Sequence, residues 1–338
     1  MATYKNIKGT TIQSLASDLP TAYVGQVWYN TTTEAYKSVV GAAAWATGGT
    51  MVTPSAGSMG GAGTQTSAVV MATGASAAST YTYDGSSWTA APSLASNQSN
   101  GSSGGASNTS AIYCGGYTGP PAYSSMTRVE EFNGSAWTTN PTTLNTARKG
   151  QGGGGLTTEA VWVGGGVTHP PSPGTNLSSA ETFNGSTWTT APGSMSQARQ
   201  YIAAAGSSTA AVVAGGQVPP PYATYDLCEL FDGSAWTTGN TLNQTRKFPR
   251  GNGTQTAAAA YGGNSAPGPA YTIYNDTELW DGTSWATSVS MSTPRDQFGS
   301  AVTATQMTAL ACGGETPSAT DATEELGMVD TVKTITTS

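Results

Sequence analysis

The side chains that could carry catalysis are few in this sequence, and they do not converge on a site. His169 is the only histidine, so a histidine-based metal cluster is excluded and a Ser-His-Asp triad has one candidate base. Glycoside hydrolysis needs two positioned carboxylates, but the glutamates recur at strand positions before an aromatic residue, which indicates a structural role. They are Glu130, Glu131, Glu181, Glu229 and Glu278. The sequence therefore predicts no catalytic residue, no metal site and no cofactor, and we expect a protein that is not an enzyme.

The three cysteines also give no sign of chemistry. Cys114 and Cys312 each stand directly before a glycine doublet, which is typical of a small buried apolar residue. Cys228 has no partner at a matching spacing. An odd count without paired spacing predicts no disulfide framework.

Four proline-rich loops hold the residues that we expect to bind a ligand. The loops span 117–123, 167–173, 217–225 and 264–274, and they contain ten of the eighteen prolines. Aromatic side chains on stiff loops lose little entropy on binding, and sugar rings stack on tyrosine faces. The predicted binding residues are Tyr117, Tyr123, His169, Tyr222, Tyr225, Tyr271 and Tyr274. Two alternatives stay open, in which these residues pack the loops against each other or the same face docks on a larger particle.

The elements that position these loops are set by a repeat of about 50 residues. Tyr-Asp-Gly, Phe-Asn-Gly or a related triplet is separated by two residues from a tryptophan, at Trp88, Trp137, Trp188, Trp236 and Trp285. In step with it, an apolar run ends in a glycine doublet five times, and a sixth, degenerate copy ends at Gly74. An arginine follows ten or eleven residues after four of the tryptophans, at Arg148, Arg199, Arg246 and Arg295. Their equivalent positions favour a symmetric structural role for these arginines.

Each repeat predicts a sheet of four short strands. A small-residue stretch such as 200–206 comes first, then the apolar run, a loop, and a third strand such as 128–132. The Asn-Gly or Asp-Gly pairs predict two-residue type I′ turns before a fourth strand that starts near the tryptophan. One such sheet cannot bury both of its faces, so neighbouring sheets must stack. Closing the array into a ring protects its exposed edges.

At this point the sequence resembles the kelch β-propeller family, in which a glycine doublet ends the second strand and a tryptophan lies in the fourth. The resemblance covers roughly residues 51–338 and implies an all-β fold, a six-bladed kelch-like β-propeller. It says little about function. The last repeat, 323–329, lacks both the turn and the tryptophan. We expect the C-terminal segment 331–338 to supply its fourth strand; in the alternative, the stretch 35–45 completes it.

Residues 1–50 break the repeat and predict a small N-terminal β-hairpin module. The segment 25–37 reads as a hairpin with its turn at 30–34, and a third short strand is expected around Trp45. The hairpin resembles short β-modules near the ends of tail-fibre and other virion proteins of tailed phages. That resemblance implies an attachment role. The alternative is that residues 1–50 only cap or close the propeller.

The amino-acid composition bears on which partners and which location fit the protein. Charged residues make up 9% of the chain, against roughly 25% in ordinary soluble domains. The net charge of −7 argues against nucleic acid as a partner. No apolar run has the length of a membrane-spanning helix, and no secretory signal is visible. A protein that looks extracellular but shows no export signal fits a virus particle released by lysis.

The sequence therefore predicts a non-enzymatic virion protein of a tailed phage, located on the virion surface as a tail fibre, head fibre or decoration protein. We expect it to contact other virion proteins through the N-terminal module and a host-surface polysaccharide or protein through the propeller. Several copies on one particle would strengthen weak single-site binding. The main alternative is a secreted kelch-type module that binds carbohydrate or protein; an enzyme is the third class.

Overall fold

The computed structural model describes residues 12–19, 26–55, 57, 59–71, 78–119, 122–170, 174–218, 223–265 and 271–335. Within these residues the chain forms strands and turns and no helix, as predicted for an all-β protein. It divides into two compact units. The terminal unit comprises Met1–Ala44 and Gly327–Ser338, and the ring unit comprises Trp45–Leu326. The predicted boundary lies after residue 50. The observed division instead lies after Ala44, and it also adds the end of the chain, from Gly327 on, to the terminal unit.

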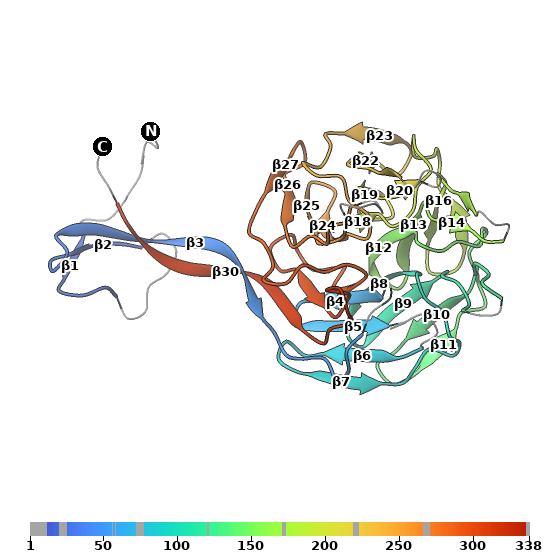
Figure 1. Ribbon diagram of the computed structural model, residues 1–338, viewed down its shortest axis with the longest axis horizontal. Helices are drawn as coiled ribbons and strands as arrows, with labels where there is room; N and C mark the ends of the chain where they lie inside the picture. Colours follow the sequence, from blue (N-terminus) through green and yellow to red (C-terminus); the bar gives the residue numbers. More distant parts are fainter. Residues whose placement is uncertain are drawn as a thin grey trace. The chain divides into compact units, whose positions relative to one another are not determined.

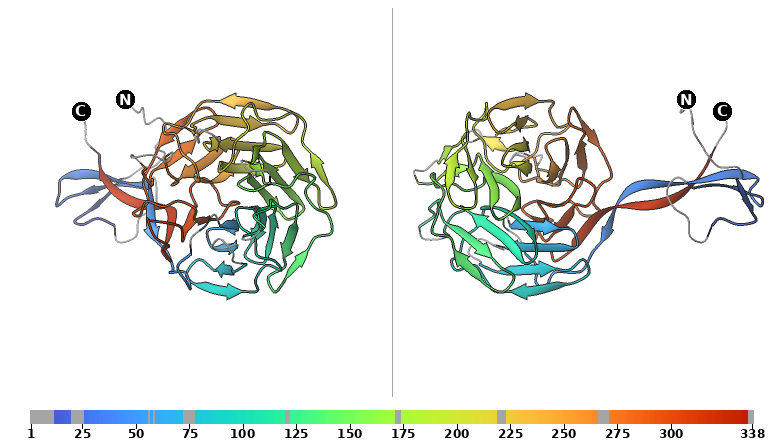
Figure 2. Two further views of the ribbon diagram at one scale, coloured as in Figure 1. Left: turned by 45° about the vertical axis from the view of Figure 1, so that its right-hand side comes forward. Right: turned by 180° about the vertical axis from the view of Figure 1, so that it is seen from behind.

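Among the described residues, five four-stranded antiparallel sheets follow one another along the ring unit. Figures 1 and 2 show them arranged around a common axis, with the first strand of each sheet nearest the axis. The strands are β4 (Gly60–Thr64), β5 (Ser67–Met71), β6 (Thr80–Tyr83) and β7 (Trp88–Ala91); β8 (Ser102–Ser107), β9 (Ser110–Cys114), β10 (Val129–Phe132) and β11 (Trp137–Thr139); β12 (Gly152–Thr157), β13 (Ala160–Gly164), β16 (Ala180–Phe183) and β17 (Trp188–Thr190); β18 (Ala203–Ser207), β19 (Ala210–Ala214), β22 (Cys228–Phe231) and β23 (Trp236–Gly239); β24 (Arg250–Thr254), β25 (Ala257–Tyr261), β26 (Thr277–Trp280) and β27 (Trp285–Thr287).

The last sheet of the ring is completed by a strand from the N-terminal part of the chain. Its order runs β28-β29-β30-β3, and β2 and β1 continue it. The strands are β28 (Gly299–Ser300), β29 (Leu310–Cys312), β30 (Thr323–Thr334) and β3 (Ala35–Thr47). After β3, the main chain at Gly48 donates a hydrogen bond to Thr323 O at 2.9 Å. The expectation that the C-terminal segment forms the fourth strand is therefore wrong, because β30 already serves as the third; the alternative is confirmed. The number of six blades stays a prediction.

The turn between the third and fourth strands differs from the prediction. Tyr83 pairs directly with Trp88, so four residues form the loop, and Gly85 has a positive φ of 93° while Asp84 does not. Instead of adopting the left-handed conformation, Asp84 accepts hydrogen bonds at Oδ1 from Ser86 N (2.9 Å) and Ser87 N (2.8 Å). The side chain thus stabilises the turn by itself, a mode typical of Asp and Asn. The expected two-residue type I′ turn is wrong.

Neighbouring sheets are joined by buried ion pairs between the repeated arginines and glutamates. Arg148 Nη2 lies 2.8 Å from Glu181 Oε1, and Arg199 Nη1 lies 2.9 Å from Glu229 Oε2. Burial lowers the pKa of Arg148, and the glutamate opposes that shift. Arg148 also donates to two main-chain carbonyls of the next sheet's loop. The pairs therefore have the structural role that the sequence predicted.

Apolar side chains fill the space between facing sheets. One cluster joins Ile112 and Val129 of one sheet to Val161 and Phe183 of the next. All three cysteines are free and buried. The sequence predicts burial for Cys114 and Cys312 as small apolar residues, and for Cys228 it predicts only the lack of a partner. Burial raises the pKa of the Cys114 thiol well above its ordinary value, so it stays protonated and unreactive at neutral pH. The core lies between the sheets and gives the loops at their ends a rigid base.

The terminal unit contains the predicted hairpin. β2 (Val27–Asn30) runs antiparallel to the start of β3, and β1 (Gln13–Leu15) runs parallel to β2. Asn30 Oδ1 accepts hydrogen bonds from Thr32 N and Thr33 N, both at 3.0 Å, which fixes the predicted turn. Trp28 is fully buried in this small unit. The hairpin is therefore confirmed, while its attachment role stays a prediction.

Candidate binding face around the central channel

Two sets of loops lie on one face of the ring unit. The loops between second and third strands are hydrogen bonded to the segments that lead from one sheet to the next; Lys247 N, for example, donates to Asn264 O at 3.0 Å. Two of the loops carry short strand pairs, β14 (Val167–Thr168) with β15 (Thr175–Asn176) and β20 (Gln217–Val218) with β21 (Ala223–Thr224). We call this surface the loop face; it comprises the described residues of 95–101, 115–128, 145–151, 165–179, 196–202, 215–227, 243–249, 262–276, 292–298 and 313–322.

A chain of residues in the left-handed conformation surrounds the mouth of the central channel on this face. Each occupies the same position just before the first strand of a sheet. We call them the collar: Asn100, Gly150, Tyr201, Phe248 and Gln297, with φ of 58°, 65°, 57°, 56° and 52°. Main-chain hydrogen bonds link four of them in sequence, from Gly150 N to Asn100 O (2.7 Å), Tyr201 N to Gly150 O (2.6 Å) and Phe248 N to Tyr201 O (3.0 Å). The collar therefore holds its side chains in a fixed order around the mouth.

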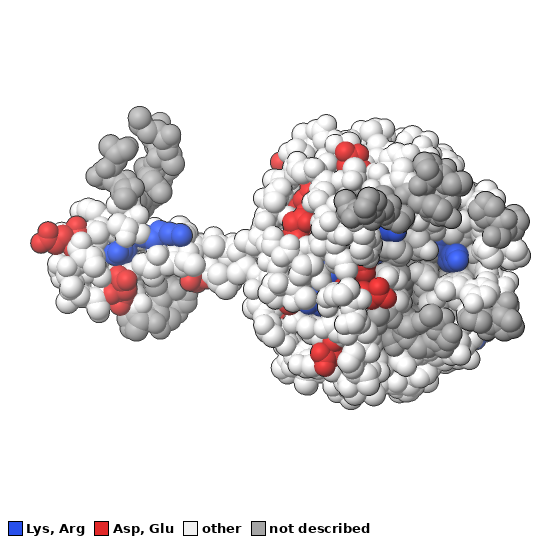
Figure 3. Space-filling view, in the orientation of Figure 1, with Lys and Arg blue, Asp and Glu red and all other residues white. Residues whose placement is uncertain are grey.

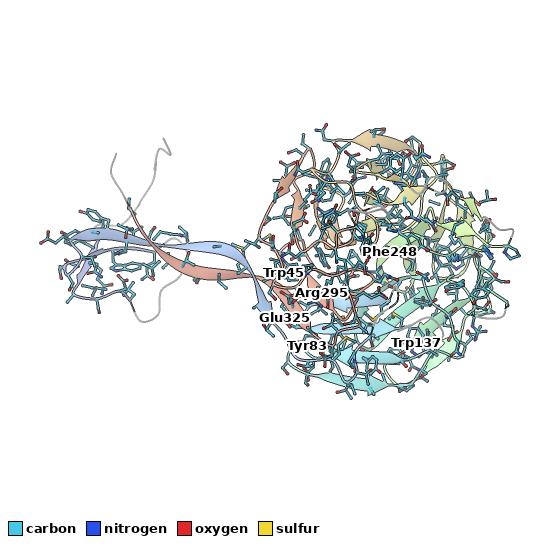
Figure 4. The ribbon with its side chains drawn as sticks, viewed as in Figure 1. Trp45, Tyr83, Trp137, Phe248, Arg295 and Glu325 are labelled. Atoms are coloured by element: carbon cyan, nitrogen blue, oxygen red, sulfur yellow. The ribbon has the colours of Figure 1, made fainter. Side chains whose placement is uncertain are left out.

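Two of the collar residues are aromatic, although the conformation disfavours them. The left-handed region costs most residues about 1–2 kcal/mol, and glycine and asparagine tolerate it best. Tyr201 and Phe248 adopt it with ring centroids 4.0 Å apart, and both side chains are half-buried. A Cβ atom on Gly150 would lie 2.7 Å from the Tyr201 ring, so the glycine makes room for that ring. Backbone strain of this kind gathers at functional sites. Figure 4 shows Phe248 near the centre of the ring unit.

The channel beneath the collar is narrow and polar. Its cavity volume is about 30 Å³, and glycines, serines and Gln151 line much of it. Arg250 projects into it and donates from Nε to Phe298 O (2.5 Å) and from Nη2 to Met59 O (2.7 Å), which ties three sheets together. Burial lowers the pKa of Arg250. A cavity of this size holds a few waters and no sugar ring, so the channel cannot enclose a larger ligand.

Three predicted binding residues lie on the first half of the loop face. Tyr123 is exposed, and its carbonyl oxygen lies 2.6 Å from His169 Nδ1, so these two residues from neighbouring loops meet. His169 N also donates to Ser125 Oγ at 2.8 Å. Tyr117 is half-buried, with Lys149 Nζ 4.3 Å from its ring centroid. One face of the Tyr117 ring is therefore covered by a cation, while Tyr123 remains accessible.

The other predicted residues are more strongly tied into the structure. Tyr271 is exposed at its ring, but its hydroxyl donates to Asp296 Oδ2 at 2.9 Å. Tyr274 is half-buried, and the Arg246 guanidinium carbon lies 5.4 Å from its ring centroid. Tyr225 is half-buried and hydrogen bonded through its main chain to Gly216. Tyr222 lies outside the described residues. The open alternative, in which tyrosines pack the loops, thus describes Tyr274 better than Tyr123.

The sequence did not single out the collar. Tyr201 and Phe248 lie outside the proline-rich loops, and the five collar residues share no residue type, so no motif marks them. The one available signal was position: each follows its tryptophan by a near-constant interval, thirteen residues from Trp188 to Tyr201 and twelve from Trp236 to Phe248. Among the described residues, the half-buried collar aromatics and the exposed Tyr123 and Tyr271 are accessible aromatic side chains of the loop face.

Charged groups on this face are few, and some are partly buried. Burial lowers the pKa of Lys149, and it lowers that of Lys247 with Asp296 opposing the shift. Burial, followed by the nearby Asp296 carboxylate, raises the pKa of Glu315. The side of the ring unit seen in Figure 3 is largely uncharged, with isolated acidic and basic groups. Such a surface favours a ligand with little net charge.

Neither a metal cluster nor a membrane span stands out. Within the described ranges, no three residues among His, Cys, Asp and Glu are grouped so that they could hold a metal ion. The described residues also include no helix long and apolar enough to cross a membrane.

Comparison with known proteins identifies the fold. No protein-family model matches the chain, and no curated protein matches its sequence. Among solved structures, that of YjhT, a bacterial β-propeller-like protein, superposes with a TM-score of 0.68 at 14% sequence identity. The match covers 83% of this chain and 99% of that chain. Since the identity is low, the likeness shows the fold alone: the chain is an all-β propeller.

Proposed function

We propose that this chain is a non-enzymatic virion protein of a tailed phage, a fibre or decoration protein whose kelch-like propeller binds a host-surface glycan on the loop face. The observation that carries the proposal is the aromatic pair at the channel mouth. Tyr201 and Phe248 are held in a strained conformation and half-buried, with their rings in contact at a tilt of 30°. Packing alone does not require aromatic residues there, because Asn100 and Gly150 fill the same position in neighbouring sheets.

The chemistry of this surface suits a sugar polymer of low charge. Sugar rings present apolar C–H faces that stack on aromatic side chains, and rings already fixed in place lose little entropy on binding. The exposed Tyr123 offers a further aromatic side chain on the same face. The low content of charged residues, 9%, also favours a neutral ligand over an ionic one.

A binding role is favoured over an enzymatic one by the way that charged groups are used. The repeated arginines and glutamates are buried between sheets, where they join one sheet to the next. The described cavities, of about 30 Å³ and 20 Å³ at the channel, are too small to enclose a sugar and exclude water from it. A ligand on an open face is held without an enclosed reaction site.

The virion role draws support from the terminal unit. Five large apolar side chains on β3 and β30 of this unit are exposed: Tyr36, Val40, Met328, Val329 and Val332. Exposed apolar groups of this kind mark surfaces that bind other proteins. A terminal unit fixed to a particle would leave the propeller free to meet the host, and many copies would convert weak binding into adhesion.

The test uses a pair of substitutions that the repeat itself supplies. Tyr201→Asn with Phe248→Asn removes both rings and keeps a residue that tolerates the left-handed conformation, as Asn100 does. Wild type and variant are compared on a glycan array of neutral and acidic bacterial polysaccharides. Tyr36→Asn in the terminal unit, another exposed aromatic, is the matched control.

We expect wild type and Tyr36→Asn to bind the same glycan, and the double variant to bind at least about tenfold more weakly, the loss of about 1.4 kcal/mol. Its melting temperature should be close to that of wild type, because relief of strain offsets the lost ring contact. Equal affinity of the double variant, or binding of no glycan by the wild type, would contradict the proposal.

A further inference from the structure

One carboxylate on the loop face is buried without an ion pair. Asp296 is 0% exposed, and no lysine, arginine or histidine among the described residues lies within ion-pair distance of it. Its Oδ1 has no hydrogen-bond partner there. Buried carboxylates are almost always paired with a cation or bound to a metal ion. The position is also unusual for the repeat, since the equivalent residues are Ser99, Lys149, Gln200 and Lys247.

A second carboxylate lies beside it. Asp296 and Glu315 form an antiparallel bridge, with Glu315 N donating to Asp296 O at 3.0 Å. Directly opposed residues in such a bridge direct their side chains to the same side. Glu315 is half-buried and also makes no ion pair among the described residues. Two ionised carboxylates at close range repel each other, and either a cation between them or protonation of one relieves the repulsion.

Neutral oxygen atoms complete the cluster. The Asn264 side chain contacts Asp296 through its amide nitrogen, and its own Oδ1 has no partner although the residue is 1% exposed. The Tyr271 hydroxyl lies 2.9 Å from Asp296 Oδ2 and 3.3 Å from Asn264 Nδ2. The Asn264 side chain, next to the Asp296 carboxylate, is thus buried with an amide oxygen that accepts no hydrogen bond. A half-turn of the Asn264 amide, which exchanges its oxygen and nitrogen, would place the unpartnered Oδ1 toward Asp296, so that the cluster could offer amide and hydroxyl oxygens together with its two carboxylates.

The nearest lysine does not resolve this excess of acceptors. Lys247 pairs with Asn264 only through the main chain, and its Nζ lies 5.5 Å from the Phe248 ring centroid. The residues between Ser265 and Tyr271, Ala-Pro-Gly-Pro-Ala, contain no cationic side chain. Lys247 and Arg250 lie close enough to Asp296 to interact with it electrostatically, but neither forms an ion pair with it among the described residues.

We propose that Asp296, Glu315, Asn264 and Tyr271 form a binding site for a divalent cation, most suitably Ca²⁺. Calcium accepts carboxylate, amide and other neutral oxygen ligands in flexible geometry, and water fills the remaining positions. Magnesium demands stricter octahedral geometry and gives up its waters reluctantly. The ion would join the loop of the fifth sheet, through Asn264 and Tyr271, to the segment that leads into the sheet that closes the ring. It would therefore stabilise the ring next to its closure.

The test is thermal unfolding and terbium luminescence on the whole chain, after treatment with a chelator. Calcium should raise the melting temperature of the wild type in a saturable way, and Tb³⁺ should give tyrosine-sensitised emission that Ca²⁺ displaces. We expect a dissociation constant on the order of 10⁻⁴–10⁻³ M, the range of extracellular sites with few charged ligands. Magnesium should shift the melting temperature less at the same concentration.

Asp296→Asn and Glu315→Gln each should weaken Ca²⁺ binding at least tenfold, while Asp232→Asn, an exposed turn carboxylate elsewhere on the ring, should leave it unchanged. Glu315→Gln, at a half-buried position, serves if Asp296→Asn fails to fold. A wild type whose melting temperature and Tb³⁺ emission do not respond to the ions would overturn the proposal. So would an equal calcium response in the Glu315→Gln variant. Glycan binding plays no part in either readout, so the test is independent of the proposed function.

Discussion

The indole nitrogen of Trp45 donates a hydrogen bond to the hydroxyl of Thr277, with 3.0 Å between Nε1 and Oγ1. The same bond recurs between Trp137 and Thr80 of the sheet before it, at 3.0 Å. In each case the threonine is the first residue of the preceding sheet's third strand. Trp45 is therefore the tryptophan that the last repeat lacks, supplied from the other end of the chain.

Trp88 makes a third bond of this series, which we call the ladder: the indole of one sheet donates to a threonine hydroxyl of the preceding sheet. Its indole donates to Thr323 Oγ1 at 2.9 Å, which links the first sheet to the last. Beside it, Tyr83 donates to Glu325 Oε1 at 2.6 Å, and Figure 4 labels both residues. Burial, then the bond to Glu325, raises the pKa of Tyr83 to about 12. The junction that closes the ring thus relies on hydrogen bonds and carries no Arg–Glu pair.

The ladder predicts a stabilising substitution. Trp188 Nε1 is buried without a partner, and the position that faces it in the preceding sheet holds Val129 in place of threonine. Val129→Thr should supply the missing acceptor and raise the free energy of unfolding by about 1 kcal/mol, the net value of one hydrogen bond. Urea unfolding measures the change.

Thr80→Val is the matched control for this prediction. It removes the existing acceptor of Trp137 and should lower the free energy of unfolding by about 1–3 kcal/mol, because a buried donor loses its partner. If Val129→Thr gave no gain and Thr80→Val left the free energy of unfolding unchanged, the indole bonds would have no role in stability.

The buried ion pairs predict strong coupling between partners. Arg148→Gln should lower the free energy of unfolding by about 3–5 kcal/mol, since it leaves the Glu181 carboxylate buried without a cation. Glu181→Gln alone should also destabilise, but the double variant should lose clearly less than the sum of the two single losses. Denaturant unfolding of all four proteins gives the coupling energy. Additive losses would show that the pair acts only as two independent packing residues.

At two other junctions between sheets, other residues take the place of the Arg–Glu ion pair. Where the arginine is absent, Gln98 Nε2 donates to Glu130 Oε1 at 3.2 Å, and Arg128 approaches the same oxygen at 2.6 Å. At the closing junction, Thr53 and Tyr81 share a hydrogen bond of 2.8 Å. Gln98 occupies the position of the arginine in the repeat, and at the closing junction Ser55 occupies it, because Gly314 N donates to Ser55 O as Gly116 N does to Arg148 O. The arginine therefore recurs only four times.

The exposed turns predict how stability responds to acid. Hydrogen bonds from Ser87 and Ser86 hold the pKa of Asp84 well below its usual range; Asp232 and Asp281 are lowered in the same way. Because these folded-state pKa values lie below the unfolded value, the stabilisation is complete above about pH 4 and is lost as the pH falls further. Asp→Asn at all three turns should flatten the fall in melting temperature below pH 4.

The repeat supplies a reference for that variant. Asn133 already makes the same contacts, accepting from Ser135 N at 3.0 Å and Ala136 N at 2.9 Å. The triple variant should therefore fold normally at pH 7. An unchanged acid response in the triple variant would show that other carboxylates control it.

The repeated residues explain which parts of the fold could be predicted. Trp88, Trp137 and their equivalents mark each fourth strand, and the glycine doublets mark where the second strands end, so sheet content follows from the sequence. The closure of the ring does not follow from the sequence, because Trp45 lacks the Asn-Gly or Asp-Gly turn that precedes the other tryptophans. The place of Trp45 in the last sheet is recognised only from the structure, in which its strand β3 lies beside β30.

The candidate site was harder to predict for a physical reason. Collar positions are fixed by main-chain hydrogen bonds between sheets, which any residue type can make, so Tyr201 and Phe248 carry no sequence signal of their own. Tyr123 and Tyr271 were predicted from their proline-rich loops and are exposed, whereas Tyr274 packs against Arg246. The proline and tyrosine content of the loops identified the loop face, but it could not distinguish an exposed tyrosine side chain from one that packs against a neighbouring residue.

Imaging of purified phage particles from the source by cryo-electron microscopy tests the central claim most directly. The account predicts a propeller on capsid or tail, joined to the particle through the terminal unit, with Tyr201, Phe248 and Tyr123 on the surface that faces outward. A propeller whose loop face is buried against the particle would contradict glycan binding there and make that face an assembly interface. Absence of the chain from every particle would contradict the virion role.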